Sequence, residues 1–126
     1  MVAKLIRKGC DARIAADVAA VLAVEDYLSD ERLAEVVARS RRRRGYGPMR
    51  IRKELEQKGL ASEAIERWSD VRSKDWLAEL ERVRQKRFGG RSPSSFAERA
   101  KQARFLQQRG FTYEQIQQAL SNHAVD

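Results

Sequence analysis

One short phrase occurs three times in this chain, and it constrains the fold more than any other feature. Each copy runs from a leucine through a basic residue and a glycine to an isoleucine: Leu5-x-x-Lys8-Gly9-Cys10-x-x-x-Ile14, Leu55-x-x-Lys58-Gly59-Leu60-x-x-x-x-Ile65 and Leu106-x-x-Arg109-Gly110-Phe111-x-x-x-x-Ile116. Each copy fits a helix that ends at the glycine, a short turn and a second helix. Since a repeated helical unit buries its apolar face against its neighbours, the phrase predicts a row of such units.

The stretches between the copies also follow helical spacing, without strand-like alternation. Ahead of the second copy, Ser29 or Asp30 is expected to cap a helix. Four residues at helical spacing are predicted to form its inward face: Leu33, Val36, Val37 and Ser40. The turn at residues 45–48, Gly-Tyr-Gly-Pro, is expected to stop this helix and to start the next, because proline suits a first helical turn.

The helix after that turn is predicted to bury Ile51 and Leu55 and to end at Gly59 in the left-handed conformation, as the later copy does at Gly110. Ser62 is expected to cap the helix that follows. Two capping boxes are predicted in the last third of the chain, at Ser95-x-x-Glu98 and at Thr112-x-x-Gln115.

The fold predicted from these signals is all-α: tandem repeats of three-helix units in an elongated, curved array. Residues 1–24 are expected to form a partial first repeat, in which Asp11 caps a helix. Residues 25–73 are expected to form the second repeat, and residues 74–126 the third. The leading helix of the first repeat has no counterpart in the sequence, which predicts either a fragment or a start that has been lost or reassigned.

The charge of the chain indicates a polyanionic partner. Its formal net charge is +8, its pI is about 10.1, and arginine outnumbers lysine. Arginine suits phosphate and carboxylate because its planar fork donates two parallel hydrogen bonds. A nucleic acid or an acidic protein face is therefore expected. The alternative is a solvated helical surface held by ion pairs.

Catalytic and metal-binding patterns are missing from the sequence. Cys10 is the only cysteine and His123 the only histidine, so neither an internal disulfide nor a zinc cluster is expected. The glycines at residues 45–47 and 89–90 lack the spacing of a phosphate loop. No apolar run reaches the length of a membrane span. These observations predict a cytoplasmic protein that is not an enzyme, has no cofactor or metal, and contacts no membrane.

Positive charge crowds around the turn at residues 45–48. The residues predicted to bind a partner there are Arg39, Arg41, Arg42, Arg43, Arg44, Tyr46, Arg50, Arg52 and Lys53. Like charges held this close repel one another unless an anion neutralises them, which is the physical reason to expect binding. The alternative is helix capping and a solvated face. Tyr46 could stack on a base or an aromatic partner, or it could cover the edge of the core.

The helix–glycine–helix phrase is also compatible with a helix-turn-helix reader of DNA. Leu55 and Leu106 argue against this interpretation, because a tight helix crossing usually has a small residue four positions before the glycine. The repetition of the phrase argues against a single recognition helix. A scaffold of salt-bridged helical repeats without a nucleic-acid role is a further alternative.

The central stretch reads Asp30-x-Arg32-Leu33-Ala34 and then Arg39-Ser40-Arg41-x-x-x-Gly45-x-Gly47-Pro48-x-Arg50-Ile51-x-x-Glu54-Leu55-x-x-Lys58-Gly59-Leu60. In these residues the chain resembles the RecX family, regulators of the RecA recombinase. The late phrase from Phe105 to Ile116 is similar to that family as well, so the resemblance covers essentially the whole chain. The departure is at the N-terminus, where the leading helix of the first repeat is not found.

The resemblance implies a negative regulator that binds the RecA–DNA filament and inhibits its ATPase, strand-exchange and coprotease activities. It implies a tandem-repeat helical protein that lies in the groove of the filament. The expected partners are the RecA filament and, weakly and without sequence preference, single-stranded and double-stranded DNA. The protein is expected to be a monomer. The residues themselves indicate a basic helical surface for a polyanion, and they do not name RecA.

Overall fold

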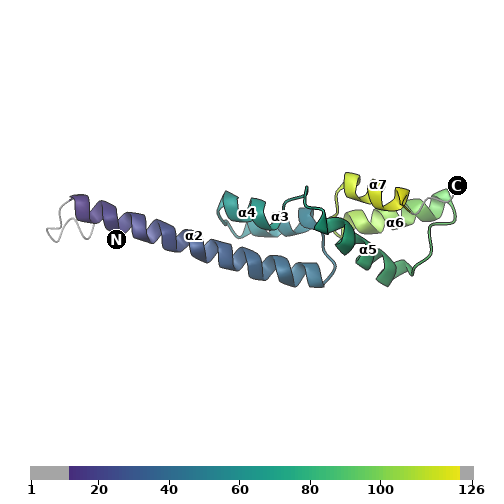
Figure 1. Ribbon diagram of the computed structural model, residues 1–126, viewed down its shortest axis with the longest axis horizontal. Helices are drawn as coiled ribbons and strands as arrows, with labels where there is room; N and C mark the ends of the chain where they lie inside the picture. The colour runs from purple at the N-terminus through teal and green to yellow at the C-terminus, as the bar shows by residue number, and fades with distance from the viewer. Residues whose placement is uncertain (1–11, 123–126) are drawn as a thin grey trace.

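The computed structural model describes residues 12–122, which form helices and connecting turns without a strand (Figure 1). The predictions made for Gly9, Cys10 and Asp11 lie outside these residues. The helices, in chain order, are α2 (Ala12–Arg43), α3 (Pro48–Gln57), α4 (Ser62–Trp68), α5 (Asp75–Phe88), α6 (Phe96–Gln108) and α7 (Tyr113–Ser121). The all-α repeat fold predicted from the sequence is confirmed.

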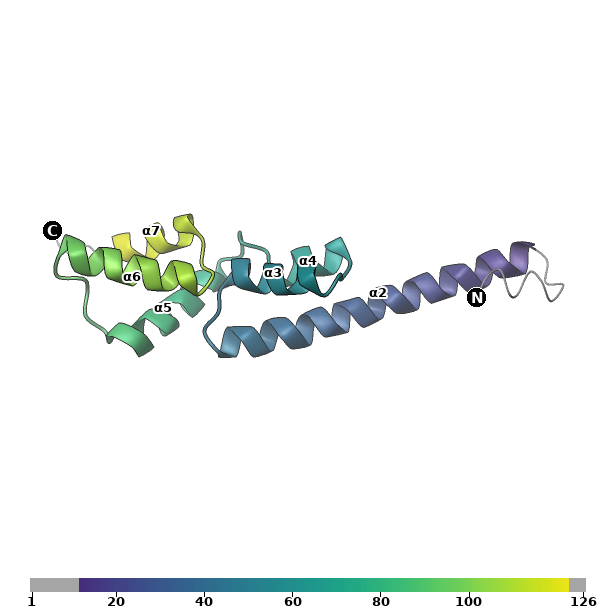
Figure 2. The ribbon, with the colours of Figure 1, turned by 180° about the vertical axis from the view of Figure 1, so that it is seen from behind.

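Helix α2 is a single helix of 32 residues, and the prediction that Ser29 or Asp30 caps a new helix is wrong. Its residues include neither glycine nor proline, so nothing in the backbone forces a break there. The Asp30 carboxylate instead accepts a hydrogen bond from the backbone N–H of Ala61, at 2.8 Å, which ties the start of α4 to α2. The N-terminal half of α2 extends well beyond α3 and α4 (Figures 1 and 2).

The C-terminal half of α2 packs with α3 and α4 as one three-helix unit, which we call unit two. The predicted inward face of α2 is right at Val37, which is buried, and wrong at Leu33 and Val36, which are 43% and 65% exposed. The residues of α2 buried beside Val37 in the shared core are Ala34 and Ala38. The predicted and the buried residues both follow helical spacing, and the prediction chose the residues with the larger side chains. The small side chains of the alanines allow neighbouring helices to approach closely.

Helices α5, α6 and α7 form the following unit, called unit three, and it shares one hydrophobic core with unit two. Ile51 and Leu55 are fully buried, as predicted. They belong to the same buried cluster as Trp76, Leu106 and Phe111 from unit three. Because the apolar cluster continues across the boundary, the two units have no water-filled layer between them and pack as one body.

The predicted helix caps are confirmed only in part. Thr112 and Gln115 form the full capping box, with each side chain bonded to the other residue's backbone N–H. Ser95 accepts from the Glu98 backbone, but the Glu98 carboxylate bonds to Ser94 and not to Ser95. Ser62 does not cap α4: Ala61 is the N-cap and makes no side-chain bond. The residue before α4 is held from α2 instead.

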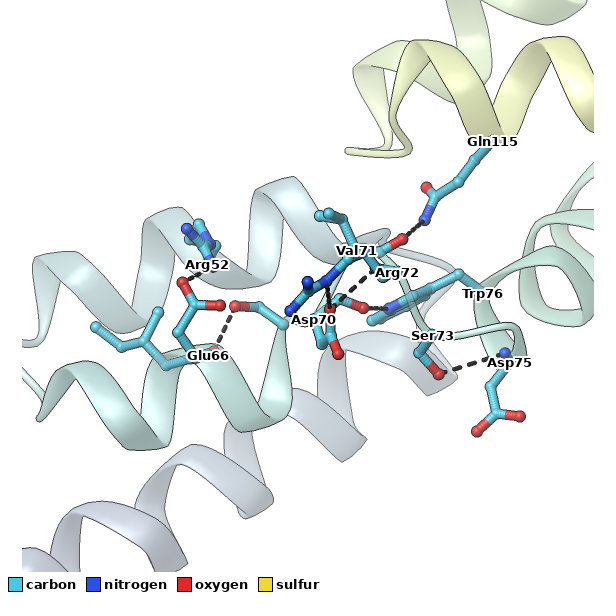
Figure 3. Close-up of polar contacts among 11 residues, drawn as sticks. Arg52, Glu66, Asp70, Val71, Arg72, Ser73, Asp75, Trp76 and Gln115 are labelled. Atoms are coloured by element: carbon cyan, nitrogen blue, oxygen red, sulfur yellow. Dashed lines mark hydrogen bonds and ion pairs between the residues drawn. The ribbon is translucent and has the colours of Figure 1, made fainter.

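Two side chains of unit three fix the linker at residues 69–74 (Figure 3). The indole N–H of Trp76 donates to the carbonyl oxygen of Asp70, at 2.9 Å. The amide of Gln115 donates to the carbonyl oxygen of Val71, at 3.1 Å, while its oxygen accepts from the Thr112 backbone. Gln115 therefore completes a helix cap and holds the linker with the same side chain.

Candidate functional site

The turn at residues 45–48 contacts the glycine turn of unit three directly, and we call this contact the joint. The backbone N–H of Gly47 donates to the carbonyl oxygen of Arg109, at 2.7 Å. The N–H of Met49 donates to the carbonyl oxygen of Gly110, at 2.9 Å. Gly110 has φ +102°, in the left-handed region, as predicted. Two backbone hydrogen bonds thus lock the turns of two different units together.

Tyr46 lies at the joint between two arginines. The guanidinium of Arg50 is 4.3 Å from the centre of its ring, and that of Arg109 is 5.0 Å away. Arg109 also donates to the carbonyl oxygen of Arg44, at 3.3 Å. Cation–π contacts therefore occupy Tyr46 within the chain. The contacts give Tyr46 a part in joining the units, which differs from both roles considered above, stacking on a partner and covering the edge of the core.

Three of the predicted binding arginines have carboxylate partners inside the chain. Arg41 forms a two-pronged ion pair with Glu54, with Nε–Oε1 and Nη2–Oε2 distances of 2.8 and 3.0 Å. Its hydrogen bonds hold the pKa of Glu54 below its ordinary range. Arg52 pairs with Glu66, and Arg39 pairs with Glu35 at 3.2 Å. These arginines fasten helices to one another or sit in surface pairs, so their charge is largely compensated.

The remaining predicted residues lie on both sides of the joint. Arg42 and Arg43 line a hollow of about 480 Å³ that also contains Trp68, and we call it the Trp68 hollow. Arg50 and Lys53 line a different hollow of about 500 Å³ beside Gln108. Among residues 12–122, no carboxylate lies within ion-pair distance of these four cations. The two basic groups flank the same turn but line different hollows.

Unit three contributes a further set of basic residues that were not predicted from the sequence. A hollow of about 240 Å³, which we call the joint pocket, lies between the end of α2, α5 and the end of α6. Its basic residues are Arg43, Arg44, Arg82, Lys86, Arg87 and Arg109. The spacing of residues 82 and 86 on α5 placed them on one helix face in the sequence. Their proximity to the Arg41–Arg44 stretch depends on how the units dock, which the spacing does not reveal.

One further arginine of unit three is structural. Arg84 is completely buried, pairs with Glu81 at 2.6 Å and donates to the carbonyl oxygen of Arg91 at 3.0 Å. It ties the loop before α6 to α5. In the described part of the chain, no group of histidine, cysteine and acidic residues is arranged to hold a metal ion. No helix between residues 12 and 122 is long and apolar enough to cross a bilayer.

Comparison with known protein families gives two matches that follow one another along the chain. The model of the second three-helix domain of RecX matches residues 29–67, and that of the third three-helix domain matches residues 74–120. These are the segments that contain unit two and unit three. The fold and the comparison thus define a protein made of tandem three-helix domains.

Individual relatives support the same conclusion. The chain is 44% identical over 116 residues to the regulatory protein RecX of Halorhodospira halophila, covering 92% of this chain and 72% of that protein. It is 42% identical over 117 residues to the regulatory protein RecX of Acidithiobacillus ferrooxidans, covering 93% and 74%. Regulatory protein RecX of Pseudomonas fluorescens is 43% identical over 105 residues. The chain belongs to the RecX family of regulatory proteins.

Proposed function

We propose that this protein is a negative regulator of RecA. It binds the RecA–DNA filament and inhibits the ATPase, strand-exchange and coprotease activities of that filament. Its membership of the RecX family supports this function, and the uncompensated positive charge around the joint is the observation that carries it. The protein acts by binding and not by catalysis.

The charge at the joint suits a helical nucleoprotein polymer as the partner. Arg42, Arg43, Arg50 and Lys53 have no ion-pair partner among the described residues, and the joint fixes the backbone of the turn between the two groups. The chain segments that carry the charge are therefore ordered before the partner binds, which lowers the entropic cost of binding. In a filament, both DNA phosphates and acidic residues of RecA are available to it.

The partners we propose are the RecA filament and, weakly and without sequence preference, single-stranded and double-stranded DNA. We further propose a cytoplasmic monomer with three repeats, at residues 1–24, 25–73 and 74–126, the first boundary falling within the continuous helix α2. The shared core of units two and three supports treating the last two repeats as one binding body.

The alternative is a helix-turn-helix regulator that reads duplex DNA. Each helix after a glycine turn would then enter the major groove. In unit two that helix is α4, which has only seven residues and exposes Glu63 and Glu66. Exposed carboxylates on a recognition helix would face DNA phosphates. This arrangement favours the filament regulator over the duplex reader.

The test is RecA-catalysed ATP hydrolysis on single-stranded DNA, measured with increasing amounts of this protein. The wild-type protein should suppress hydrolysis. The triple variant Arg42→Ala/Arg43→Ala/Lys53→Ala should suppress it more weakly. If all three residues contact phosphate, the log–log salt dependence of filament binding should flatten by about 2, at about 0.7 per contact on a single strand.

The matched control is Arg32→Ala/Lys101→Ala/Arg104→Ala. It removes the same charge from exposed positions that line none of the three hollows described above. The control should inhibit RecA like the wild type. Wild-type protein that leaves ATP hydrolysis unchanged would overturn the proposed function. Preference for one duplex sequence over a random single strand would favour the alternative.

A further inference from the structure

The joint pocket concentrates positive charge that the described residues neutralise only at Arg82. Six basic side chains line it, and its lining includes no carboxylate. Only Arg82 has an ion-pair partner within residues 12–122, Glu79 at 3.0 Å. Five cations from three separate segments therefore face one small hollow without a counter-charge. Such crowding is unfavourable in the free protein and becomes favourable when an anion enters.

Two arginines of the pocket are also held by backbone carbonyls, and Arg82 is held by Glu79 as well. Arg82 donates to the carbonyl oxygen of Arg42 at 2.8 Å, and Arg109 donates to that of Arg44 at 3.3 Å. A carbonyl orients a guanidinium without cancelling its charge. The same hydrogen bonds occupy the carbonyl oxygens of Arg42 and Arg44 at the end of α2, which would otherwise repel an anion. The pocket is thus arranged before any ligand arrives.

An aromatic wall completes the pocket and fixes two of its arginines. The guanidinium carbons of Arg87 and Arg109 lie 5.5 and 5.2 Å from the centre of the Phe105 ring. Phe88 supports that ring edge-on, with the ring centres 5.4 Å apart. A guanidinium that contacts a ring by its face keeps its N–H edges free to donate to oxygen. Phosphate oxygens, like carboxylate oxygens, fit this fork with two parallel hydrogen bonds.

The joint pocket continues into the Trp68 hollow, because Arg43 and Arg82 line both. The two hollows form a track that runs from Phe105 to Trp68, and its lining is basic except for Glu79, which pairs with Arg82. A ligand with one phosphate would occupy only part of this track. A chain of phosphates would use its whole length, and a positively charged groove that follows the backbone is typical of surfaces that bind single strands.

We propose that the joint pocket is a phosphate-binding subsite for single-stranded nucleic acid, whose backbone follows the track toward Trp68. A single strand bends, so its phosphates reach into a recess. Duplex DNA is stiff over about 150 base pairs and presents its phosphates on a convex surface, so it meets only the rim. This inference rests on the proposed function in one respect: the RecA filament supplies the strand.

The test is the binding of fluorescently labelled oligothymidylate to the full chain, by anisotropy at several salt concentrations, without RecA. The key variant is Lys86→Gln/Arg87→Gln, whose residues are exposed and line the joint pocket. Its affinity should fall, and its log–log salt slope should flatten by about 1.4, at about 0.7 per lost phosphate contact. Arg87→Lys alone, which keeps the charge, should retain most of the salt slope.

The matched control is Lys101→Gln/Arg104→Gln, which removes two exposed charges of α6 outside the pocket. It should bind oligothymidylate with the wild-type salt slope. Thermal melts followed by circular dichroism should be the same for all variants, because none of the substituted residues is buried. Equal loss of affinity in the control and the key variant would overturn the inference. It would show that binding depends on the net charge of the protein and not on the position of the charges in the pocket.

Competitors identify the source of the phosphate. Unlabelled oligothymidylate should displace the probe at lower phosphate concentration than duplex DNA, inorganic phosphate or pyrophosphate. Displacement by inorganic phosphate at equal phosphate concentration would make the pocket a receptor for a free anion and overturn the proposal. Polyglutamate binding that depends on Lys86 and Arg87, with oligothymidylate binding unchanged, would assign the pocket to an acidic protein segment and also overturn it.

RecA assays with the same proteins keep the two proposals apart. If wild-type protein inhibits RecA but the key variant binds oligothymidylate normally, the subsite fails and the proposed function stands. If wild-type protein does not inhibit RecA but the salt slope flattens as expected, the subsite stands and the proposed function fails.

Discussion

The turns at Gly59 and Gly110 read almost alike in the sequence, yet their surroundings differ. Both glycines have positive φ, +70° and +102°, and both follow a helix of their unit. Gly59 is exposed, and a Cβ added there would meet no atom within 4 Å. A Cβ added at Gly110 would lie 2.6 Å from the Cβ of Arg50 and 2.7 Å from its backbone nitrogen. One turn faces solvent, and the other faces the preceding unit.

The comparison shows that one sequence phrase serves two physical purposes. At Gly59 the glycine is needed for its backbone conformation alone. At Gly110 it is needed for that conformation and for the close approach of another backbone. The same contrast separates Gly47, where an added Cβ would lie 2.6 Å from the backbone of Gly110 and Phe111, from Gly90, where it would meet nothing. Units two and three are joined where both close-packed glycines meet.

The largest effect is expected for Gly110→Ala. Alanine would have to adopt the left-handed conformation and would also clash with Arg50, whose contacting atoms belong to or adjoin the backbone. The two costs together should lower the free energy of unfolding by roughly 2 to 5 kcal/mol. Denaturant unfolding measures this loss. A loss no larger than that of Gly59→Ala would contradict the difference between the two turns.

Gly47→Ala should have the next largest effect. It separates the cost of the steric clash from the cost of the left-handed backbone conformation. Gly47 has φ −91°, which any residue adopts, so only the clash with the Gly110 turn remains. Overpacking of this kind should cost about 1 to 3 kcal/mol. The combination Gly47→Ala/Gly110→Ala should be less destabilising than the sum, because both variants break the same contact. Additive losses would mean that the two glycines do not act at one joint.

Gly59→Ala should cost about 1 kcal/mol, from backbone strain alone. Gly90→Ala is the control at an open glycine and should change the free energy of unfolding by less than about 0.5 kcal/mol. Thermal and denaturant melts of both variants provide the measurement. If Gly59→Ala leaves the free energy of unfolding unchanged, the left-handed turn at the end of α3 is not required for stability.

The smallest effect on stability is expected from the Arg41–Glu54 ion pair within unit two, and it depends on pH. The pKa of Glu54 is lowered in the folded state by its hydrogen bonds to Arg41, whose own pKa is raised, so Arg41 stays charged throughout. The stability that Glu54 contributes is present above its unfolded pKa, roughly 4.3, and is lost as the pH falls through the folded value. The backbone bonds of the joint carry no such dependence.

This dependence is measured as the stability difference between wild-type protein and Glu54→Gln from neutral pH into acid. Asp70 and Glu98, whose pKa values are also lowered, are present in both proteins. Their contributions to the pH dependence therefore cancel when the two stabilities are subtracted. The difference should shrink as the pH falls. A constant difference would show that the Arg41–Glu54 pair contributes nothing through charge.

The sequence was sufficient for the helices and their glycine turns, and insufficient where two candidate patterns compete. Glycine and proline stop helices by local backbone geometry, so the turns at residues 45–48, 59 and 110 were predictable. Ser29 and Asp30 imitate a cap, but α2 continues because tertiary contacts override local signals. The inward face of α2 was misread because Ala34 and Ala38 repeat at the same spacing as larger residues.

The location of the candidate site in the sequence was predictable, but the residues that form its surface were not. The crowding of arginine near residues 45–48 is visible in the sequence. The pairing of Arg41 with Glu54, and of Arg52 with Glu66, joins residues 13 and 14 positions apart, where no helical spacing indicates contact. The contribution of Lys86 and Arg87 depends on how unit three docks, and a nonlocal backbone contact at the joint sets that docking.

Hydrogen exchange at the backbone amides of Gly47 and Met49 tests most directly whether units two and three form one body. These amides donate across the joint, to Arg109 and Gly110. Followed by NMR, both should exchange as slowly as the amide of Leu55 in the core of α3, through unfolding of the whole body. Exchange as fast as that of the open turn at Gly90, with Leu55 still protected, would show that the units separate freely and that the joint does not hold the basic surface together.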